Sequence, residues 1–401
     1  MEVVAPPHSR AGRGVSTRQR RSGYVVVAPG LEKIVTAEMR GIGIVPLESA
    51  AGGVSFTGTD EHLFSANLHL RTASRVLVRV ALFEATAFHE LERLCGGVPW
   101  ERYVAAGGAV RLRVTCHKSK LYHSDGVAQR VARAIAKRVK GVAVGAPARE
   151  PADDANEPPE EQAAQLFVVR FDHDQCTISA DSSGELLHRR GYRQATAKAP
   201  IRETLAAASL LTLGWDGATP LVDPMCGAGT IAIEAALLAR RIAPGLARSF
   251  ACERWPGVNT AAFAKLRDRA REAVLTAAPT PIMASDRDAG AIAAAQANAV
   301  RAGVSGDTVI AKHALSAAVA PSAAGLVLTN PPYGARVGDR KELRSLYAQL
   351  GNVARAKFPG WTLAFLSADR SLDAQVKLPL TEALRFRNGG IPVRLVRAIA
   401  G

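Results

Sequence analysis

The sequence predicts an α/β protein in which a doubly wound parallel sheet follows a smaller α+β region. From residue 221 onward, short apolar segments alternate with segments that have the apolar spacing of helices, which is typical of a parallel sheet covered by helices. Between residues 24 and 83 the order strand, helix, strand, helix, strand predicts a small α+β sandwich. A length of 401 residues also favours two or three domains over one.

Four segments are expected along the chain. Residues 1–22 hold five arginines, two prolines and little apolar periodicity, which predicts a disordered basic arm. The three folded parts are then predicted at 23–86, 87–185 and 186–401, the last including a connector at 187–193. Residues 141–163 are rich in Pro, Ala and acidic residues, so a mobile loop is expected inside the second part.

The elements of the first two parts follow from apolar periodicity. Strands are expected at 24–28, 53–56, 75–83, 109–114, 166–171 and 175–180, and helices at 31–40, 61–70, 88–94 and 125–140. The last two strands are three residues apart and predict a hairpin through 172–174.

The third part repeats strand and helix. Helices are expected at 201–213, 230–240, 288–302 and 340–357, and strands at 221–223, 281–286, 308–310, 325–329 and 361–366. Two further segments, 384–386 and 393–396, predict a C-terminal hairpin. Proline at position 200 suits the first turn of the first of these helices.

Charge points to an anionic partner. The net charge is +15 and the pI about 10, and residues 111–140 carry nine Lys or Arg against one acid. Such clustering favours nucleic acid, although a merely basic soluble protein is the alternative. No uncharged apolar stretch is long enough to span a membrane, no signal peptide is recognisable, and five cysteines show no CxxC spacing. We therefore expect a cytoplasmic protein with no structural metal and no membrane partner.

A glycine turn follows the strand at 221–223. Gly227 and Gly229 lie between strand and helix, where a backbone free of side chains can approach a nucleoside-type ligand. An ordinary tight turn is the alternative. Asp286 ends the next strand, where an acid accepts hydrogen bonds from ribose hydroxyls. Asp288 is its rival, and the spacing favours Asp286 for the ribose and Asp288 for the helix cap.

Asn330, Pro331, Pro332 and Tyr333 follow the strand at 325–329 and are the predicted catalytic residues. The Asn side-chain oxygen and a backbone carbonyl freed by the proline pair can accept hydrogen bonds from an exocyclic amine, while Tyr333 stacks on the ring. A proline-rich turn without a ligand is the alternative. Together with the glycine turn, this motif indicates methyl transfer from S-adenosylmethionine (SAM) to an amino nitrogen, with positioning supplying much of the rate.

On these residues the chain resembles the THUMP-containing class I RNA methyltransferases, and among them the 23S rRNA guanine-N2 methyltransferases. The matching segments are 24–32, 187–193, 199–207, 223–230, 242–256 and 330–334. The resemblance implies a ferredoxin-like domain, a THUMP RNA-binding domain and a Rossmann-like domain that binds SAM. It also implies that Gly227 and Gly229 approach the methionine part of SAM, that Asp286 binds the ribose, and that residues 330–333 hold the base amine.

Three features depart from the family. Lys312, His313 and Ala314 stand where the family often has an acid near the adenine. A second methyltransferase domain, which some members carry, is not expected within 401 residues. The loop at 141–163 is acidic and rich in proline, which bears on how RNA docks.

The predicted contacts complete the hypothesis. The expected SAM-binding residues are Asp223, Cys226, Gly227, Gly229, Thr230, Asp286, Arg287, His313 and Ala314. The expected RNA contacts are Arg111, Arg113, Lys118, Lys120, Arg130, Arg133, Lys137, Arg189, Arg190 and Arg193, although the connector arginines have a solvated linker as their alternative. The expected substrate is 23S rRNA, with tRNA guanine as the alternative and a non-catalytic RNA-binding assembly factor as the competing function.

Overall fold

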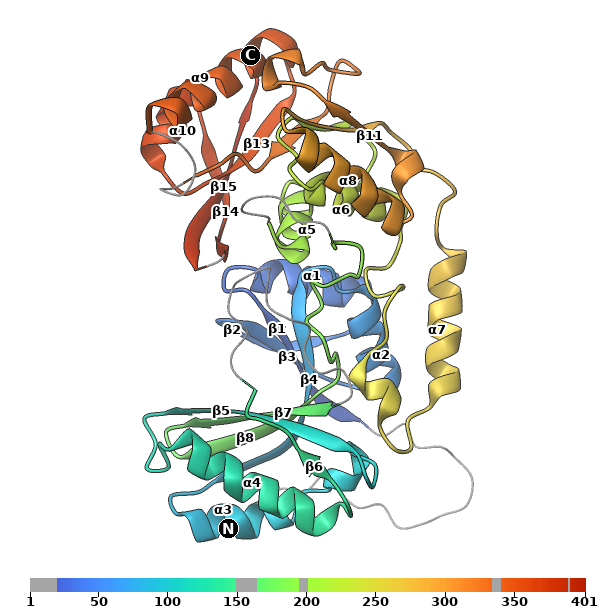
Figure 1. Ribbon diagram of the computed structural model, residues 1–401, viewed down its shortest axis with the longest axis vertical. Helices are drawn as coiled ribbons and strands as arrows, with labels where there is room; N and C mark the ends of the chain where they lie inside the picture. Colours follow the sequence, from blue (N-terminus) through green and yellow to red (C-terminus); the bar gives the residue numbers. More distant parts are fainter. Residues whose placement is uncertain (1–19, 149–163, 195–200, 334–339, 389) are drawn as a thin grey trace.

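The computed structural model describes residues 20–148, 164–194, 201–333, 340–388 and 390–401. Residues 1–19, which make up most of the predicted basic arm, and residues 149–163 of the predicted acidic loop lie outside this range, as does the proline at 200. The first strand begins at Arg21, so the last two residues of the predicted arm belong to a strand. The described part of the chain forms an elongated molecule with one sheet toward each end (Figure 1).

The first sheet has eight strands in the order β2-β3-β1-β4-β8-β7-β5-β6. Its strands are β1 (Arg21–Val27), β2 (Pro46–Ala50), β3 (Gly53–Gly58), β4 (Ala73–Glu84), β5 (Ala109–His117), β6 (Ala143–Val144), β7 (Ala164–Asp172) and β8 (Gln175–Asp181). Its helices are α1 (Glu32–Gly41), α2 (Asp60–His69), α3 (Phe88–Gly96) and α4 (Ser124–Arg138). The predicted hairpin is confirmed: β7 and β8 are antiparallel, and His173 and Asp174 adopt positive φ between them.

Strand β4 joins the two predicted N-terminal parts into one sheet. Its first half pairs with β1 and its second half with β8, both antiparallel. A strand of 12 residues is long enough to serve two neighbours in this way. The division at residues 86 and 87 stays a prediction, since the hydrogen bonding of the sheet crosses it without a break.

The second sheet has seven strands in the order β11-β10-β9-β12-β13-β15-β14. Its strands are β9 (Leu221–Asp223), β10 (Ile282–Asp286), β11 (Thr308–Lys312), β12 (Leu326–Thr329), β13 (Thr362–Ser367), β14 (Thr381–Asn388) and β15 (Ile391–Ile399). The first five are parallel, and β15 and β14 add an antiparallel hairpin. Its helices are α5 (Glu203–Thr212), α6 (Thr230–Ala239), α7 (Thr260–Glu272), α8 (Ala289–Arg301), α9 (Arg340–Lys357) and α10 (Arg370–Val376). This arrangement confirms the predicted α/β fold with a Rossmann-like sheet.

Four of the α-helices and β-strands named above were not predicted. Strand β2 has a largely exposed sequence and β6 has only two residues, so neither shows a clear alternation of apolar residues. Helix α7 buries only Phe263 and Ala270 among its 13 residues, and α10 is two turns long. Short or polar elements of this kind are stabilised by tertiary contacts rather than by a periodic apolar face.

The segment 242–256 connects the N-terminal region to the second sheet through hydrogen bonds and close packing. The backbone N–H of Gly245 donates to the Leu68 carbonyl at 3.0 Å, and a Cβ at Gly245 would lie 2.8 Å from the Asn67 carbonyl oxygen. The Trp255 indole N–H donates to the Gln165 side chain at 2.6 Å. This segment, one of those that match the family, therefore serves as a contact between the N-terminal region and the second sheet.

Candidate active site and RNA-binding surface

The predicted catalytic and cofactor residues meet at one edge of the second sheet. Strands β9, β10 and β12 are neighbours and parallel, so their carboxyl ends, at Asp223, Asp286 and Thr329, lie at the same edge. Ligands of doubly wound sheets bind at this edge, where the strand order reverses. Here the reversal falls between β9 and β12, which is where the glycine turn and residues 330–333 follow.

The glycine turn is tight and close to a neighbouring helix. Gly227 and Gly229 have φ of +52° and +82°, a region that side chains disfavour. A Cβ on Gly229 would lie 3.0 Å from the Cβ of Ala295 in α8. The turn therefore needs glycine for its backbone conformation, and at Gly229 also for the approach of α8.

Asp286 holds the glycine turn against the end of β10. One carboxylate oxygen accepts a hydrogen bond from the Gly227 N–H at 3.0 Å, and the other accepts one from the Asp288 N–H at 3.0 Å. Asp288 itself accepts from the Ala291 N–H at 2.9 Å, so the predicted helix cap is confirmed. Binding of a ribose by Asp286 stays a prediction. The hydrogen bond from Gly227 already holds this carboxylate beside the glycine turn.

Asp223 is 1% exposed and joins the ends of two strands. Its carboxylate accepts hydrogen bonds from the Thr329 hydroxyl at 2.7 Å and from the Met225 N–H at 3.3 Å. Burial is the main cause that raises the pKa of this carboxyl to about 7, and the negative charge of the nearby Asp286 contributes in the same direction. Cys226 and Thr230 are buried in the same turn, where burial also raises the pKa of the Cys226 thiol.

The neighbouring strand end is open to solvent. Arg287, Lys312, His313 and Ala314 are exposed, and the His313 N–H donates to the Asp286 carbonyl at 3.1 Å. The predicted adenine side of the site is thus accessible beside the predicted ribose carboxylate.

Asn330 carries an unsatisfied buried acceptor. Its side-chain oxygen is buried and has no hydrogen-bond partner among the described residues. Buried polar atoms are nearly always paired, because leaving one unpaired costs about 1–3 kcal/mol. An acceptor left open at a strand end is suited to an N–H group of a ligand.

Tyr333 is held by a residue that was not predicted. The Asn388 side-chain N–H donates to the Tyr333 hydroxyl at 3.0 Å, and burial raises the pKa of this tyrosine. The Tyr347 hydroxyl lies 3.5 Å from the Pro332 carbonyl. Asn388 lies on β14, 55 residues further along the chain, and no local pattern marks it.

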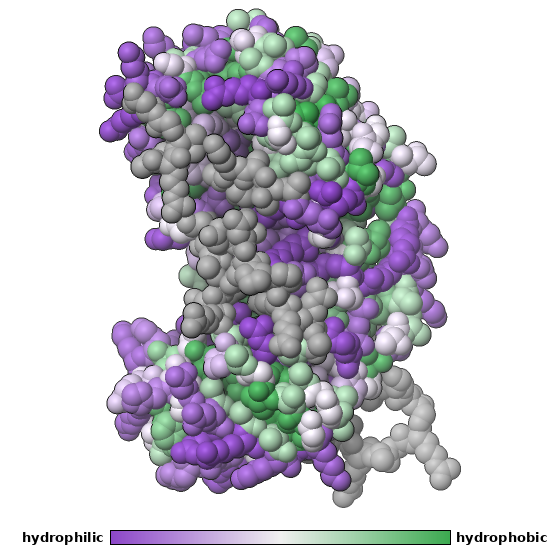
Figure 2. Space-filling model, viewed as in Figure 1, coloured by the Kyte–Doolittle hydropathy of each residue, from purple (hydrophilic) through white to green (hydrophobic). Residues whose placement is uncertain are grey.

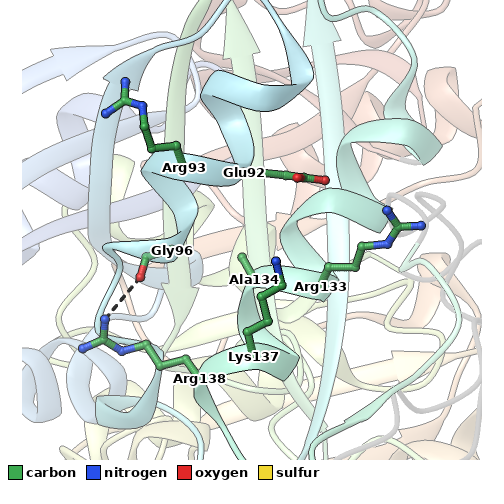
Figure 3. Close-up of a pocket in the computed structure, with 7 residues that line it drawn as sticks. All are labelled: Glu92, Arg93, Gly96, Arg133, Ala134, Lys137 and Arg138. Atoms are coloured by element: carbon green, nitrogen blue, oxygen red, sulfur yellow. Dashed lines mark hydrogen bonds between the residues drawn. The ribbon is translucent and has the colours of Figure 1, made fainter.

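A cavity of about 400 Å³ lies between α3 and α4 in the N-terminal region (Figure 3). It is lined by Glu92, Arg93, Gly96, Arg133, Ala134, Lys137 and Arg138. Arg93, Arg133 and Lys137 are exposed and form no ion pair within the part of the chain that the structure describes. Hydrophilic side chains also gather along the lower end of the molecule in Figure 2, over these two helices. Arg93, Arg133 and Lys137 at this cavity are therefore available to bind an anion.

Other cations of this region already have partners. Arg138 makes a two-pronged contact with Glu101, at 2.5 and 2.7 Å, and Arg130 pairs with Glu92 at 3.3 Å while lying over the Phe88 ring. Lys118 and Lys120 are exposed near the end of β5. RNA contact by Arg130, Arg133, Lys137, Lys118 and Lys120 stays a prediction.

The structure corrects the sequence hypothesis at Arg113. Strand β5 lies between β7 and β6, and Arg113 in its middle is 9% exposed, while Arg111 is half-buried. An arginine side chain that is 9% exposed is not presented to a phosphate backbone. The alternation that places both arginines on one face does not show that this face is covered.

The connector arginines are a second correction. Arg190 is 4% exposed, lies 3.6 Å from Glu234, and donates to the carbonyls of Leu187 and Arg71. Arg193 pairs with Glu203 at 3.2 Å and has a nearly buried side chain. Arg190 and Arg193 therefore fit neither the predicted contact with RNA nor the alternative of a solvated linker. Glu234 of α6 and Glu203 of α5 pair with them in the interior.

The rest of the connector follows the same pattern. Arg189 is partly buried and pairs with Glu185 at 3.0 Å. His188 is buried, and burial among arginines holds its pKa well below the usual value. Arg248 donates to the backbone carbonyls of Leu186 and Arg189, at 2.7 and 3.1 Å. These contacts make the connector an interior structural element.

One side-chain cluster has the composition of a metal site. His117, Asp172 and His173 offer ligand atoms within 4.8 Å of one another at the ends of β5 and β7. Both histidine Nδ1 atoms lie about 3 Å from the same Asp172 oxygen, and the Arg170 guanidinium lies 3.4 Å from the other. The side chains of His117, Asp172 and His173 are well exposed. The Arg170 guanidinium would compete with a metal ion for the Asp172 carboxylate.

Among the described helices, none has the length and apolar composition required to cross a membrane.

Comparisons with known proteins agree with this geometry. Residues 190–397 match the family model described as the RMKL-like methyltransferase domain, and residues 24–77 match the RlmL ferredoxin-like domain. The chain is 36% identical over 386 residues to the ribosomal RNA large subunit methyltransferase K/L of Syntrophotalea carbinolica, covering 93% of this chain and 53% of that protein. The chain thus spans about half the length of this relative. The chain is also 34% identical over 370 residues to YpsC of Bacillus subtilis, whose name describes it as a candidate RNA methyltransferase. This match covers 92% of this chain and 93% of YpsC.

Two solved structures share the fold over almost the whole chain. SMU.472, crystallised with SAH, has a TM-score of 0.82 and 29% identity, covering 96% of this chain and 99% of that one. A protein of Listeria monocytogenes, named a predicted N6-adenine-specific DNA methylase, has a TM-score of 0.81 and 32% identity, with 96% and 97% covered.

Proposed function

The chain belongs to the family of RMKL-like methyltransferases, and we propose that it transfers a methyl group from SAM to the exocyclic N2 of a guanine in 23S rRNA. The relatives named as ribosomal RNA large subunit methyltransferases support the choice of rRNA. The tRNA guanine is the alternative substrate.

The unpaired side-chain oxygen of Asn330 is the observation that carries this proposal. An exocyclic amino group has two N–H donors, and its lone pair is conjugated with the ring. An acceptor buried beside the sheet edge would take one N–H and orient the nitrogen for reaction. The rigid Pro331-Pro332 pair keeps the backbone carbonyls beside Asn330 out of regular secondary structure, so that one can accept the second N–H.

Tyr333 would supply the stacking surface for the base. Its hydroxyl is tied to Asn388, so the ring is held from β14 while residues 330–332 extend from β12. Two independent strands therefore position the ring relative to the Asn330 acceptor. We infer that Asn388 is a positioning residue for the base.

The glycine turn and Asp286 fit the cofactor. The turn at Gly227 and Gly229 carries no side chain of its own at these two positions, and the Asp286 carboxylate and the exposed Lys312, His313 and Ala314 lie at the adjoining strand ends. SAM supplies a methyl group made electrophilic by its positively charged sulfur. The SAH in SMU.472 supports the assignment of this cofactor.

The cavity between α3 and α4 is the proposed contact for the RNA backbone. Arg93, Arg133 and Lys137 surround it without ion-pair partners among the described residues, and each can release counterions from a phosphate. Such contacts position RNA without reading its sequence.

The deciding experiment incubates the protein with radiolabelled SAM and unmodified 23S rRNA or tRNA, followed by nucleoside mass spectrometry. We expect N2-methylguanosine in 23S rRNA. The same product in tRNA alone would make tRNA the substrate. N6-methyladenosine in place of N2-methylguanosine would make adenine the target base. RNA binding without SAM binding would overturn the proposal in favour of the non-catalytic assembly factor.

Asn330→Ala tests the role of the open acceptor. We expect turnover to fall by at least about a hundredfold, in line with the loss of a transition-state contact, while SAM affinity stays within a few-fold. Calorimetry with SAM and single-turnover kinetics would check both. Near-normal turnover would contradict the assignment.

A further inference from the structure

We propose that Asn298 and Arg301 of α8 are positioning residues that couple the connector 187–193 to the glycine turn, so that docking of the connector sets the affinity for SAM. The proposal rests on the proposed function only in taking the glycine turn as the SAM site. It concerns two residues that contact neither the base nor the reacting atoms.

Asn298 is hydrogen-bonded to the middle of the glycine turn. Its side chain is fully buried, and its Nδ2 donates to the carbonyl of Ala228 at 3.1 Å. Ala228 lies between Gly227 and Gly229, the two residues with positive φ. Glycines leave a turn with many accessible conformations, so a hydrogen bond to the peptide between them is an effective restraint.

Arg301 fixes the orientation of this amide. The Arg301 guanidinium donates through Nη2 to the Asn298 side-chain oxygen, and arginine has no acceptor. The oxygen must therefore face Arg301, which leaves Nδ2 facing the Ala228 carbonyl. Through Nε, the same guanidinium donates to the Tyr192 carbonyl at 2.8 Å. One arginine thus links the connector backbone to the residue that grips the turn.

The connector also holds the helix that follows the turn. Tyr192 donates from its hydroxyl to Glu234 at 3.0 Å, and Arg190 lies 3.6 Å from the same carboxylate. Glu234 is in the second turn of α6, which begins at Thr230 directly after the glycine turn. Helices α6 and α8 lie side by side in Figure 1, so the connector restrains both helices that flank the turn.

The N-terminal region shares this network through Arg71. This buried residue follows α2 and donates to the carbonyls of Leu237 and Ile242, at 3.3 and 2.6 Å, at the end of α6. The carbonyl of Arg71 in turn accepts from Arg190. The region that carries the proposed RNA surface is therefore joined through the connector to the proposed cofactor turn.

The test measures SAM affinity by calorimetry on the full chain, for the wild type, Asn298→Ala, Arg301→Ala and the double variant. We expect the Kd for SAM to rise about five- to tenfold for Asn298→Ala, as for one lost hydrogen bond, and about threefold for Arg301→Ala. Because both residues act through one contact, the double variant should match Asn298→Ala rather than the product of the two effects. Turnover at saturating SAM should stay within about twofold, so KM for SAM rises while kcat does not.

Gln296→Ala is the matched control. Gln296 is exposed on the same helix and donates to the Ile310 carbonyl at 3.1 Å, away from the turn. Its removal should leave the Kd for SAM unchanged. Arg301 is exposed, so its replacement tests the link even if Asn298→Ala fails to fold.

The outcomes separate the two proposals. If the wild type binds SAM and Arg301→Ala binds it equally well, the coupling to the connector is wrong while the proposed function stands. Equal weakening by Gln296→Ala, or independent effects in the double variant, would also overturn the coupling. A wild type that binds no SAM would instead overturn the proposed function.

Discussion

The connector 187–193 and the surface of α3 and α4 are both rich in arginine, yet the structure uses the charge in opposite ways. In the connector, Arg190 and Arg193 are buried against Glu234 and Glu203. At the α3–α4 cavity, Arg133 and Lys137 are exposed and have no ion-pair partner among the residues described. The difference shows that a run of cations in the sequence is open to solvent only where no acid from another segment pairs with it.

The difference has an energetic meaning. Removing one partner of a buried ion pair leaves the other charge uncompensated, which costs about 3–5 kcal/mol, whereas exposed ion pairs contribute at most about 1 kcal/mol. Replacements in the connector should therefore change stability, and replacements at the cavity should change binding. The predictions below test this separation, beginning with the largest effect.

Arg190→Ala should lower the free energy of unfolding by about 3–5 kcal/mol, because the buried Glu234 would lose the cation that pairs with it at 3.6 Å and keep only the nearby Arg71. Urea denaturation followed by circular dichroism measures the change. The double variant Arg190→Ala with Glu234→Gln should recover part of the loss, since the stranded charge is gone. A loss below about 1 kcal/mol for the single variant would place Arg190 among the surface cations.

Asp223 extends the comparison to a buried acid with no cation beside it. Its pKa is raised to about 7, against about 4 in an unfolded chain, so the folded state holds the proton more tightly. The unfavourable contribution of Asp223 is therefore absent below about pH 4, grows as pH rises to about 7, and is complete above that.

Asp223→Asn should remove this pH dependence. The Tm of the variant, relative to the wild type, should be higher at pH 8 than at pH 5, because only the wild type must ionise a buried group. Thermal scans of both proteins at the two pH values would check this. A difference in Tm that does not change with pH would show that Asp223 does not titrate in this range.

The double replacement Arg133→Ala and Lys137→Ala should weaken RNA binding without unfolding the protein. Loss of two phosphate contacts should reduce the slope of log K against log salt by about 2, and stability should stay within about 0.5 kcal/mol. Fluorescence anisotropy over a range of salt concentrations measures the slope. An unchanged slope would place the RNA on another surface.

Arg271→Ala is a control that removes one exposed positive charge outside the cavity, and it has the smallest expected effect. Arg271 lies on α7 and pairs with Asp268 at 2.8 Å, and both side chains are more than half exposed. We expect no resolvable change in RNA affinity and less than about 0.5 kcal/mol in stability. A loss of binding free energy half that of the cavity variant would mean that only net charge matters.

The sequence was sufficient for the elements with strong periodicity and for the motif positions. Strand β9 and helix α9 have the predicted bounds, and the C-terminal hairpin, the Asp288 cap and the parallel sheet were all expected. Helices and strands of this kind depend on residues within one or two turns of each other, so local spacing carries the information.

The sequence did not predict Asn388, the single eight-stranded sheet, or the burial of Arg113. Asn388 contacts Tyr333 across 55 residues, and β4 pairs with β8 across about 100 residues. The alternation in β5 places Arg113 on the face opposite Val110 and Leu112, and only the folded structure shows that this face is also covered at Arg113.

The chain by itself determined which segments become helices and strands, where the glycine turn and residues 330–333 lie along it, and that an excess of positive charge must be accommodated. Only the tertiary structure decided which arginines meet an acid and which meet solvent. Arg190 and Glu234 are 44 residues apart in sequence, and folding brings them into one interior. The physical reason is that local structure depends on neighbouring residues, whereas the electrostatic environment of a side chain depends on every segment that packs around it.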